Sequence, residues 1–289
     1  MKNKKIFEDV IHGIFLLLGL VTVACVLLIT VYLVIAGIPA IREIGLVKFL
    51  FGKEWASTAA EPKYGILPFA AILGLIVGLL VLEPHFSASI IIIAVGGVMM
   101  FLGGVRLGWF IGAGSAAAVG IGVLLMLFPY ASGRINTWRD PFSSSSDEGY
   151  QIVQSLYTIG SGGLSGLGLG MSRQKYLYLP EEHNDFIFSV VCEELGFIGA
   201  ALILLLFALL ILRGYWIALH CRDRFSFLVV AGITTLLAIQ VFLNVAVVTN
   251  LVPCTGISLP FFSYGGTALL IQLGEMGIIL SASRDVIEK

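Results

Sequence analysis

Long apolar stretches recur along this chain and constrain its fold more than any other feature. Each offers about 17 to 26 mostly apolar residues, enough for an α-helix to cross a hydrocarbon core of about 30 Å. Because backbone groups in lipid must be satisfied within the segment, such stretches form helices. The sequence therefore predicts an all-α, polytopic membrane helix bundle of about seven transmembrane helices, at residues 13–37, 65–83, 88–104, 107–129, 186–212, 225–250 and 261–283.

The composition agrees with a membrane protein and argues against other classes. Hydrophobic residues make up 58% of the 289 residues and charged residues 12%, whereas soluble domains carry about 25% charged residues. The net charge of −1 indicates no nucleic acid partner, and membrane lipids are the expected surroundings. The first apolar run is too long for the hydrophobic region of a signal peptide, so we expect a retained helix.

The positions of lysine and arginine predict the topology. The short connector 213–224 is rich in arginine, which indicates a cytoplasmic position. The long loop 130–185 is then extracytoplasmic and the C-terminus is cytoplasmic. The basic start MKNKK disagrees with this assignment, because seven crossings place the two termini on opposite sides. The orientation of the first helix therefore stays open.

Polar and charged side chains gather between Tyr150 and Ala200, directly before an apolar run that starts at Phe186. Ionisable residues at a membrane boundary indicate function. Asp185 stands at the start of the apolar run, where a functional carboxylate and a plain helix N-cap are both open interpretations.

Two further segments surround this carboxylate in the expected fold. Tyr150 to Tyr157 has helical spacing, which predicts a short amphipathic or re-entrant helix, and the glycines of 162–170 predict a flexible turn after it. Prolines and paired glycines interrupt the helical pattern at 251–267, on the same face as the long loop. Irregular backbone at membrane depth is tolerated where it lines a wet cavity, so the 130–185 loop and the 251–267 segment are expected to line one cavity open to the outside.

Four strings carry a resemblance to a known family: LEPHFS, YQIVQSLYTIGSGGLSGLGLGMSRQKYLYLPEEHNDFIF, CEELGFIGA and LVPCTGISLPFFSYGGTALL. Over residues 64–289 the chain resembles the SEDS family (shape, elongation, division and sporulation), the membrane-embedded peptidoglycan glycosyltransferases of the FtsW and RodA type. The resemblance implies polymerisation of lipid II into glycan strands outside the bacterial cytoplasmic membrane, during cell division or elongation. It also implies a class B penicillin-binding transpeptidase as partner.

The resemblance implies roles for particular residues. Asp185 matches the family's carboxylate and is the expected general base, which takes the proton from an acceptor sugar hydroxyl. The leaving group is a lipid pyrophosphate, whose charge favours cations or a divalent metal such as magnesium or manganese. Arg134, Arg173 and Lys175 are the nearby cations that would bind it. The metal ligands stay unknown, and no other cofactor is expected.

The remaining residues of the matching strings are assigned by the same resemblance. His183, Ser263 and Tyr264 are expected to bind substrate. Glu193 and Glu194 follow in the next helix, where we expect them to satisfy partners within the bundle.

The chain departs from the family pattern at its start. The family has ten spans, and residues 65–289 resemble its last six, so the counterparts of the first four and their Ser-Glu-x-x-Lys type motif are not found. Residues 1–65 instead resemble the N-terminus of a phosphate ABC-transporter permease, through GIPAIREIGLVKFLFGKEW followed by YGILP. We interpret the chain as a chimera of a permease-like segment, 1–64, and a SEDS-like domain, 65–289. Alternatives to glycosyltransfer are a non-catalytic scaffold, a lipid II flippase or a transporter permease subunit.

Overall fold

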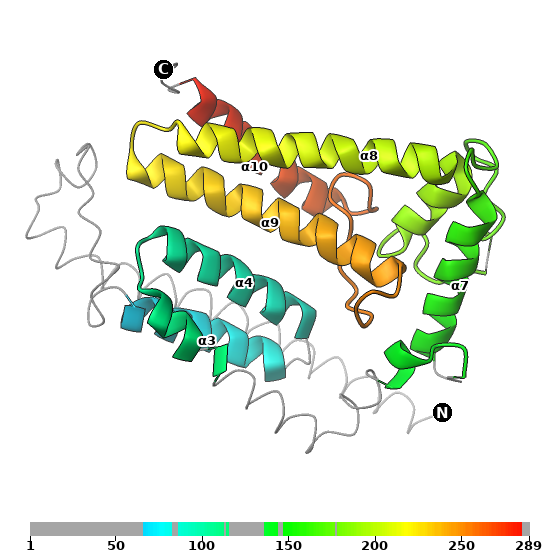
Figure 1. Ribbon diagram of the computed structural model, residues 1–289, viewed down its shortest axis with the longest axis horizontal. Helices are drawn as coiled ribbons and strands as arrows, with labels where there is room; N and C mark the ends of the chain where they lie inside the picture. Colours follow the sequence, from blue (N-terminus) through cyan, green and yellow to red (C-terminus); the bar gives the residue numbers. More distant parts are fainter. Residues whose placement is uncertain are drawn as a thin grey trace, which may run out of the picture. The chain divides into compact units, whose positions relative to one another are not determined.

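The computed structural model describes residues 66–82, 86–112, 114–115, 136–143, 147–176 and 178–284 (Figure 1). The described residues are helical or irregular and contain no strand, which confirms the all-α class. Their helices are α3 (Leu67–Leu82), α4 (Phe86–Leu102), α7 (Asp147–Gly162), α8 (Ile187–Leu219), α9 (Arg224–Val248) and α10 (Gly266–Ser283). The predicted segment 1–64 lies outside the described residues, so the proposed domain division stays a prediction.

Five of the predicted spans coincide with helices. Within the described residues α8, α9 and α10 are long and apolar enough to cross a membrane, and α3 and α4 are shorter apolar helices. The predicted span 13–37 lies outside the described residues, as does most of 107–129. The number of spans therefore stays a prediction.

Two helix boundaries differ from the predicted ones. We expected the fifth hydrophobic stretch to end at residue 212, but α8 continues to Leu219. In this last part Trp216 contacts two neighbours. The Arg213 guanidinium lies 4.1 Å and the His220 ring 4.3 Å from the centre of the Trp216 ring. We expected the last span to begin at residue 261, but α10 begins at Gly266, because the preceding residues form an irregular turn around Phe261, whose φ is 64°.

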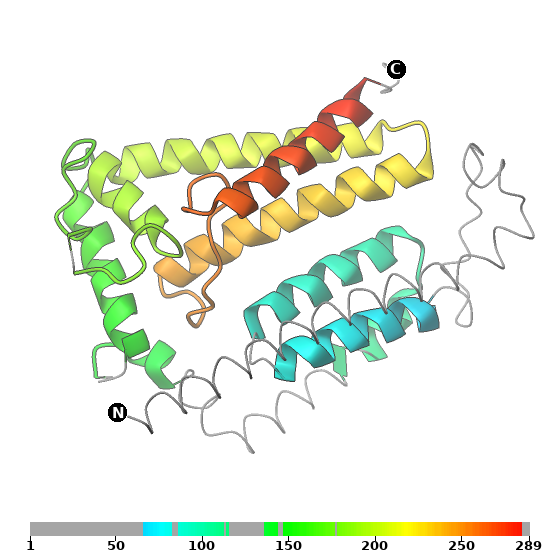
Figure 2. The same cartoon turned by 180° about the vertical axis from the view of Figure 1, so that it is seen from behind.

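The helices pack around α9. It lies against α8 along much of its length and also contacts α4, α7 and α10, while α3 lies against α4 (Figures 1 and 2). Glycines permit the close approaches: a Cβ on Gly214 of α8 would lie 2.5 Å from Thr234 Oγ1 of α9, and one on Gly232 would lie 2.8 Å from Met99 Sδ of α4. Small residues at such contacts are the usual means of packing membrane helices.

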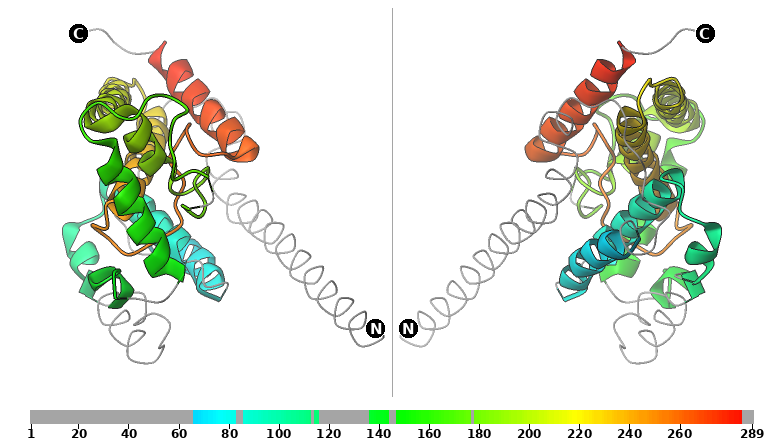
Figure 3. Two further views of the ribbon diagram at one scale, coloured as in Figure 1. Left: turned by 90° about the vertical axis from the view of Figure 1, so that its right-hand side faces the viewer. Right: turned by 90° about the vertical axis from the view of Figure 1, so that its left-hand side faces the viewer.

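α8 is interrupted at Gly196, whose backbone has φ 67° and ψ −172°. The segment before the break lies at a steep angle to the long segment after it, and α7 lies beside the broken end (Figures 1 and 3). A break of this kind leaves backbone donors and acceptors of the helix without their usual partners. Another part of the chain must therefore supply them.

The glycine-rich loop after α7 supplies these partners. Four backbone hydrogen bonds join it to α8: Leu167 N–H to Glu193 O at 2.9 Å, Gly168 N–H to Glu194 O at 3.0 Å, Phe197 N–H to Gly163 O at 2.9 Å and Ile198 N–H to Leu164 O at 3.2 Å. The expected flexible turn over 162–170 is thus held by hydrogen bonds on both of its sides. A Cβ on Gly162, Gly166 or Gly196 would overlap backbone atoms of the opposing segment, so these positions require glycine.

The segment between α9 and α10 is fixed at its start by a reciprocal pair of hydrogen bonds. Trp138 Nε1 donates to Asn250 O at 3.1 Å, and Asn250 Nδ2 donates to Trp138 O at 3.2 Å. Asn250 has a φ of 58°, a left-handed conformation that asparagine tolerates better than most residues. The chain turns out of α9 here and runs back toward the loop that precedes α8.

Candidate functional site

The loop that carries Asp185 is joined to the segment before α10 and to α9 by three successive backbone carbonyls. Tyr264 N–H donates to His183 O at 2.8 Å, Ser263 Oγ donates to Asn184 O at 2.7 Å, and Asn244 Nδ2 donates to Asp185 O at 2.7 Å. The structure therefore brings the two irregular segments together, as the sequence predicted. It also fixes the backbone position of each residue around the carboxylate.

Asn244 is the buried centre of this arrangement. Its side chain is 1% exposed, and its Nδ2 also donates to Ile257 O at 2.7 Å. One amide thus joins α9 to Asp185 and to the 251–265 segment. Its Oδ1 finds no hydrogen-bond partner within the described residues. Sequence reasoning did not select Asn244, although an amide inside an apolar helix is the signal that could have identified it.

The Asp185 carboxylate is half-buried, and no hydrogen bond to it occurs among the described residues. The N-cap of α8 is Phe186 and has no side-chain capping bond, so Asp185 does not act as the helix cap. Burial, and secondarily the charge of Glu181, raises the pKa of Asp185 above its ordinary value. A Cβ on Gly256 would lie 3.2 Å from Asp185 Oδ2, so this glycine gives the carboxylate its space.

A pocket of about 670 Å³ lies beside this loop. Its lining joins the loop, the first turn of α8 and the start of α10: His183, Ile187, Phe261, Phe262, Ser263, Tyr264, Gly265, Gly266 and Leu269. Three residues predicted to bind substrate therefore line one pocket. Tyr264 is 85% exposed, whereas the Ser263 hydroxyl also accepts a hydrogen bond from Leu259 N–H at 2.8 Å. The Tyr264 side chain is thus accessible, and the Ser263 side chain holds the loop.

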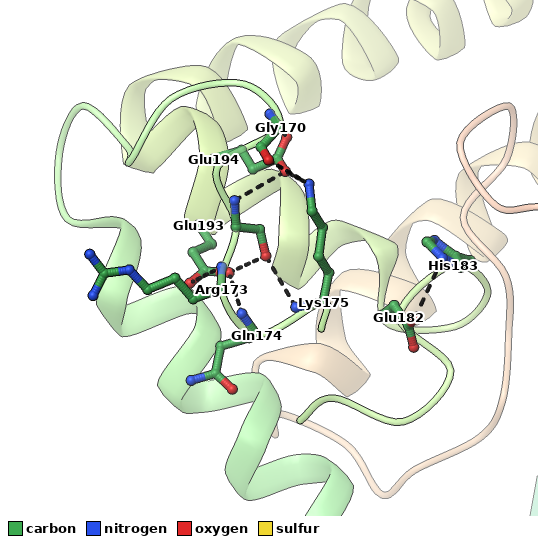
Figure 4. A network of polar contacts seen from close by, with 9 residues as sticks. Gly170, Arg173, Gln174, Lys175, Glu182, His183, Glu193 and Glu194 are labelled. Carbon is green, nitrogen blue, oxygen red and sulfur yellow. Dashed lines mark hydrogen bonds and ion pairs between the residues drawn. The ribbon is translucent and has the colours of Figure 1, made fainter. Parts of the chain in front are cut away.

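A second polar cluster surrounds two glutamates of α8, Glu193 and Glu194 (Figure 4). Glu193 is 1% exposed and accepts hydrogen bonds from Ser172 Oγ and from Ser161 Oγ, the latter at 3.2 Å. The backbone N–H groups of Arg173 and Gln174 also donate to it, at 3.3 and 3.4 Å. A buried carboxylate needs several such donors, so Glu193 fixes the fold of this loop rather than facing a ligand.

Glu194 binds the same loop through Lys175. The Lys175 Nζ lies 2.8 Å from Glu194 Oε1 and also donates to Gly170 O at 2.8 Å (Figure 4). The hydrogen bond to Glu194 raises the pKa of Lys175 above its ordinary value. The charge of Lys175 is thus already paired, whereas Arg173 is exposed and its guanidinium points away from the cluster in Figure 4.

The other predicted ligands are placed as follows. Arg134 lies outside the described residues. His183 is exposed, and its Nε2 lies 3.5 Å from Glu182 Oε1. Within the described residues no group of three or more histidine, cysteine or acidic side chains is arranged to hold a metal ion. The roles of these residues in binding stay predictions.

The sequence matches a family model described as cell cycle protein, FtsW/RodA/SpoVE, over residues 44–287. It is 42% identical to stage V sporulation protein E of Bacillus subtilis over 83% of this chain and 65% of that protein. It is 41% identical to a probable peptidoglycan glycosyltransferase FtsW of a Geobacter species, over 76% of this chain and 60% of that protein.

The fold is similar to that of a chain in a solved peptidoglycan synthase complex, described as coordinating polymerization and crosslinking. The TM-score is 0.64 at 30% sequence identity, over 81% of this chain and 66% of the other. The chain therefore spans about two thirds or less of the length of each of these three proteins.

Proposed function

Because the chain belongs to the FtsW/RodA/SpoVE family of cell cycle proteins, we propose that it is a peptidoglycan glycosyltransferase that polymerises lipid II into glycan strands. The observation that carries this proposal is Asp185, a half-buried carboxylate without a hydrogen-bond partner among the described residues, in the loop beside the pocket. A half-buried carboxylate without hydrogen bonds lowers the stability of the fold, and such carboxylates are concentrated at functional sites. General-base catalysis would use such a carboxylate.

In the proposed reaction Asp185 accepts the proton of an acceptor sugar hydroxyl as the hydroxyl oxygen forms a bond to the anomeric carbon of the donor. The bond from that carbon to the lipid pyrophosphate breaks, and the pyrophosphate leaves with the electron pair. The raised pKa of Asp185 makes its carboxylate a better proton acceptor than an exposed aspartate. The hydrogen bonds to the carbonyls of residues 183–185 would hold the base in position during this step.

The leaving pyrophosphate needs positive charge. Arg173 is the exposed cation of the described loop, and Arg134 is the second candidate. Lys175 would reach the pyrophosphate only after leaving Glu194. A magnesium or manganese ion would neutralise the charge that develops on the leaving oxygen.

The family membership also supports a location and a partner. The chain is a multi-pass membrane protein, and we place it in the bacterial cytoplasmic membrane with the 130–185 loop outside and the C-terminus in the cytoplasm. A class B penicillin-binding transpeptidase would be its partner, because the similar solved complex couples polymerization to crosslinking. Division, elongation and sporulation are all roles of the family's namesakes.

The permease-like origin of residues 1–64 stays a proposal. The family model begins at residue 44 and so covers part of the permease-like string, GIPAIREIGLVKFLFGKEW. This overlap favours a join nearer the start of the chain than residue 64.

The test is polymerisation of labelled lipid II by the purified chain together with a transpeptidase. Replacing the base should lower the rate at least about 100-fold in Asp185→Asn. Glu182→Gln, the matched amide replacement in the same loop, should keep most of the activity. No polymer from either protein would favour a scaffold or permease role, and equal polymer from wild type and Asp185→Asn would exclude our assignment of the base.

A further inference from the structure

The glycine-rich loop after α7 exposes a run of apolar side chains. Among its residues Leu164 is 72% exposed, Leu167 41%, Leu169 78% and Met171 65%. Covering apolar area is favourable in proportion to the area removed from water, so this loop is costly to leave in water. An apolar patch of this kind indicates a surface that another phase or another molecule covers in the functioning protein.

The backbone of this loop is fixed, so it cannot turn these side chains inward. Four backbone hydrogen bonds join it to α8 on both sides of the break at Gly196. Its far end is held as well, because Gly170 N–H donates to Glu194 Oε2 at 2.9 Å and Lys175 Nζ donates to Gly170 O at 2.8 Å (Figure 4). The apolar side chains are therefore presented outward by a rigid support.

The loop lies beside the first turn of α8 that follows the break. Phe197 N–H donates to Gly163 O at 2.9 Å, and Ile198 N–H donates to Leu164 O at 3.2 Å. Phe197 and Ile198 are themselves exposed, and α8 is one of the helices long and apolar enough to cross a membrane. The medium that surrounds this first turn of α8 therefore also meets the apolar side chains of the loop.

The length of α8 indicates the depth at which this turn lies. Near the other end of the helix Trp216 contacts Arg213 and His220, and tryptophan beside cationic side chains is typical of a membrane interface. From Phe197 to Trp216 the helix rises about 29 Å, at about 1.5 Å per residue. This rise nearly equals the thickness of a hydrocarbon core, about 30 Å. With Trp216 at one boundary of the core, Phe197 and the loop beside it lie at the other.

The residues that follow the loop carry the side chains that an interface favours. Tyr176 and Tyr178 are both exposed, and tyrosine gathers at the level of lipid headgroups because its ring is apolar and its hydroxyl is polar. The exposed Arg173 guanidinium points away from the cluster of Glu193 and Glu194 (Figure 4). An arginine in this place can bind lipid phosphates while its methylene stem lies along apolar surface.

We propose that the glycine-rich loop, residues 163–171, inserts its apolar side chains into the outer leaflet of the phospholipid membrane and acts as a fixed interfacial anchor. The insertion goes beyond the proposed function and needs no enzymatic activity, and the choice of leaflet follows from the location proposed above. Directly after the anchor, the Ser172 hydroxyl donates to Glu193 and so joins the loop to the first segment of α8, which begins after Asp185. The anchor thereby holds the candidate base at a constant depth relative to the lipid headgroups.

The test places a small fluorescent amino acid at Leu169 of the full chain in nanodiscs of phosphatidylglycerol and phosphatidylcholine. Quenching by phosphatidylcholine brominated near the glycerol ends of its acyl chains is compared with quenching by iodide in the water. The brominated lipid should remove as much emission as it does from the same label at Leu212, an exposed position of α8 between Phe197 and Trp216, and iodide should have little effect. The same label at Arg222, exposed in the connector beyond Trp216, is the control for water and should show the reverse.

Two results would overturn the proposal. Strong quenching by iodide at Leu169, with little effect of the brominated lipid, would place the loop in water. Little quenching by either agent would show that protein covers the loop, as it covers the docking surface of a partner chain. If the label at Leu169 lowers the temperature of thermal unfolding, Leu164 is labelled instead. Quenching needs no turnover, so a loop found in water leaves the proposed function standing, and a chain that makes no polymer leaves the anchor standing.

Discussion

Asp185 lies where its ionised form is less stable than in water. Burial and the neighbouring charge of Glu181 raise its pKa, and no hydrogen bond within the described residues compensates. A residue that lowers the stability of the fold and lies in a loop whose neighbouring residue His183 lines a pocket is a candidate for function rather than for structure. This combination separates Asp185 from Glu193, whose carboxylate is surrounded by donors.

The raised pKa gives a prediction about pH. As the pH rises above the ordinary pKa of an aspartate, the unfolded chain releases the proton first, so the free energy of unfolding falls until the folded pKa is passed. Asp185→Asn removes this fall and should be more stable than wild type at neutral pH, by up to about 1 kcal/mol because the group is only half-buried. The measurement is the difference in thermal unfolding between the two proteins from about pH 4 to pH 8.

The same shift predicts where activity is lost. The base works only when ionised, so polymerisation should decline with falling pH at a higher pH than an exposed aspartate would give.

The stability difference between wild type and Asp185→Asn tests the shift itself. If this difference did not change with pH, the carboxylate would be ionised as easily in the folded chain as in water.

Asn244 provides the second prediction at this scale. Asn244→Ala removes the side-chain donor from two carbonyl oxygens, the part-buried one of Asp185 and the buried one of Ile257. The free energy of unfolding should fall by about 2 to 4 kcal/mol, and polymerisation at least tenfold, because the base loses its position. Thermal unfolding and the lipid II assay measure the two effects.

Thr249→Ala is the control for Asn244→Ala, since the Thr249 hydroxyl bonds only to carbonyls in its own helix turn, Val245 O and Ala246 O. If the two variants lost activity equally, Asn244 would have no special role in positioning Asp185.

At the scale of elements, the break in α8 determines how the site is built. It turns the first segment of the helix back, so that the loop of Asp185 meets the segment before α10. The glycine-rich loop after α7 is the complement of this break, because it satisfies the interrupted backbone hydrogen bonds. Its other end is fixed to the same helix by Glu193 and by the ion pair of Glu194 with Lys175.

Two glycines of α7 test this account with the same substitution. A Cβ on Gly162 would overlap the carbonyl of Cys192, whereas one on Gly160 would meet nothing within 4 Å. Gly162→Ala should therefore lower the free energy of unfolding by about 3 kcal/mol or more. Gly160→Ala should leave it unchanged or raise it by up to about 1 kcal/mol, since alanine favours a helix.

Thermal unfolding of the two variants decides the point. Equal stability would mean that α7 and α8 do not lie in contact at Cys192.

At the scale of the whole molecule, α9 connects the other helices. Its Gly232 lies against α4, its Thr234 lies against Gly214 of α8, and its last turns carry Asn244, whose amide binds the Asp185 carbonyl. The described helices therefore bring the candidate base and the pocket together on the elements α8 to α10 and their connecting segments. Polymerisation by this chain would show that these elements, with the rest of the 289 residues, are sufficient.

Sequence alone determined the helical class, the positions of five apolar helices that the structure describes, and the family. Hydropathy and helical spacing are local properties, because residues close together in the chain determine them. Only the tertiary structure decided that Lys175 is paired with Glu194, that Asn244 holds Asp185 and that a glycine loop fills the break at Gly196. These features depend on which donors and acceptors meet after packing, and residues far apart in the chain determine that together.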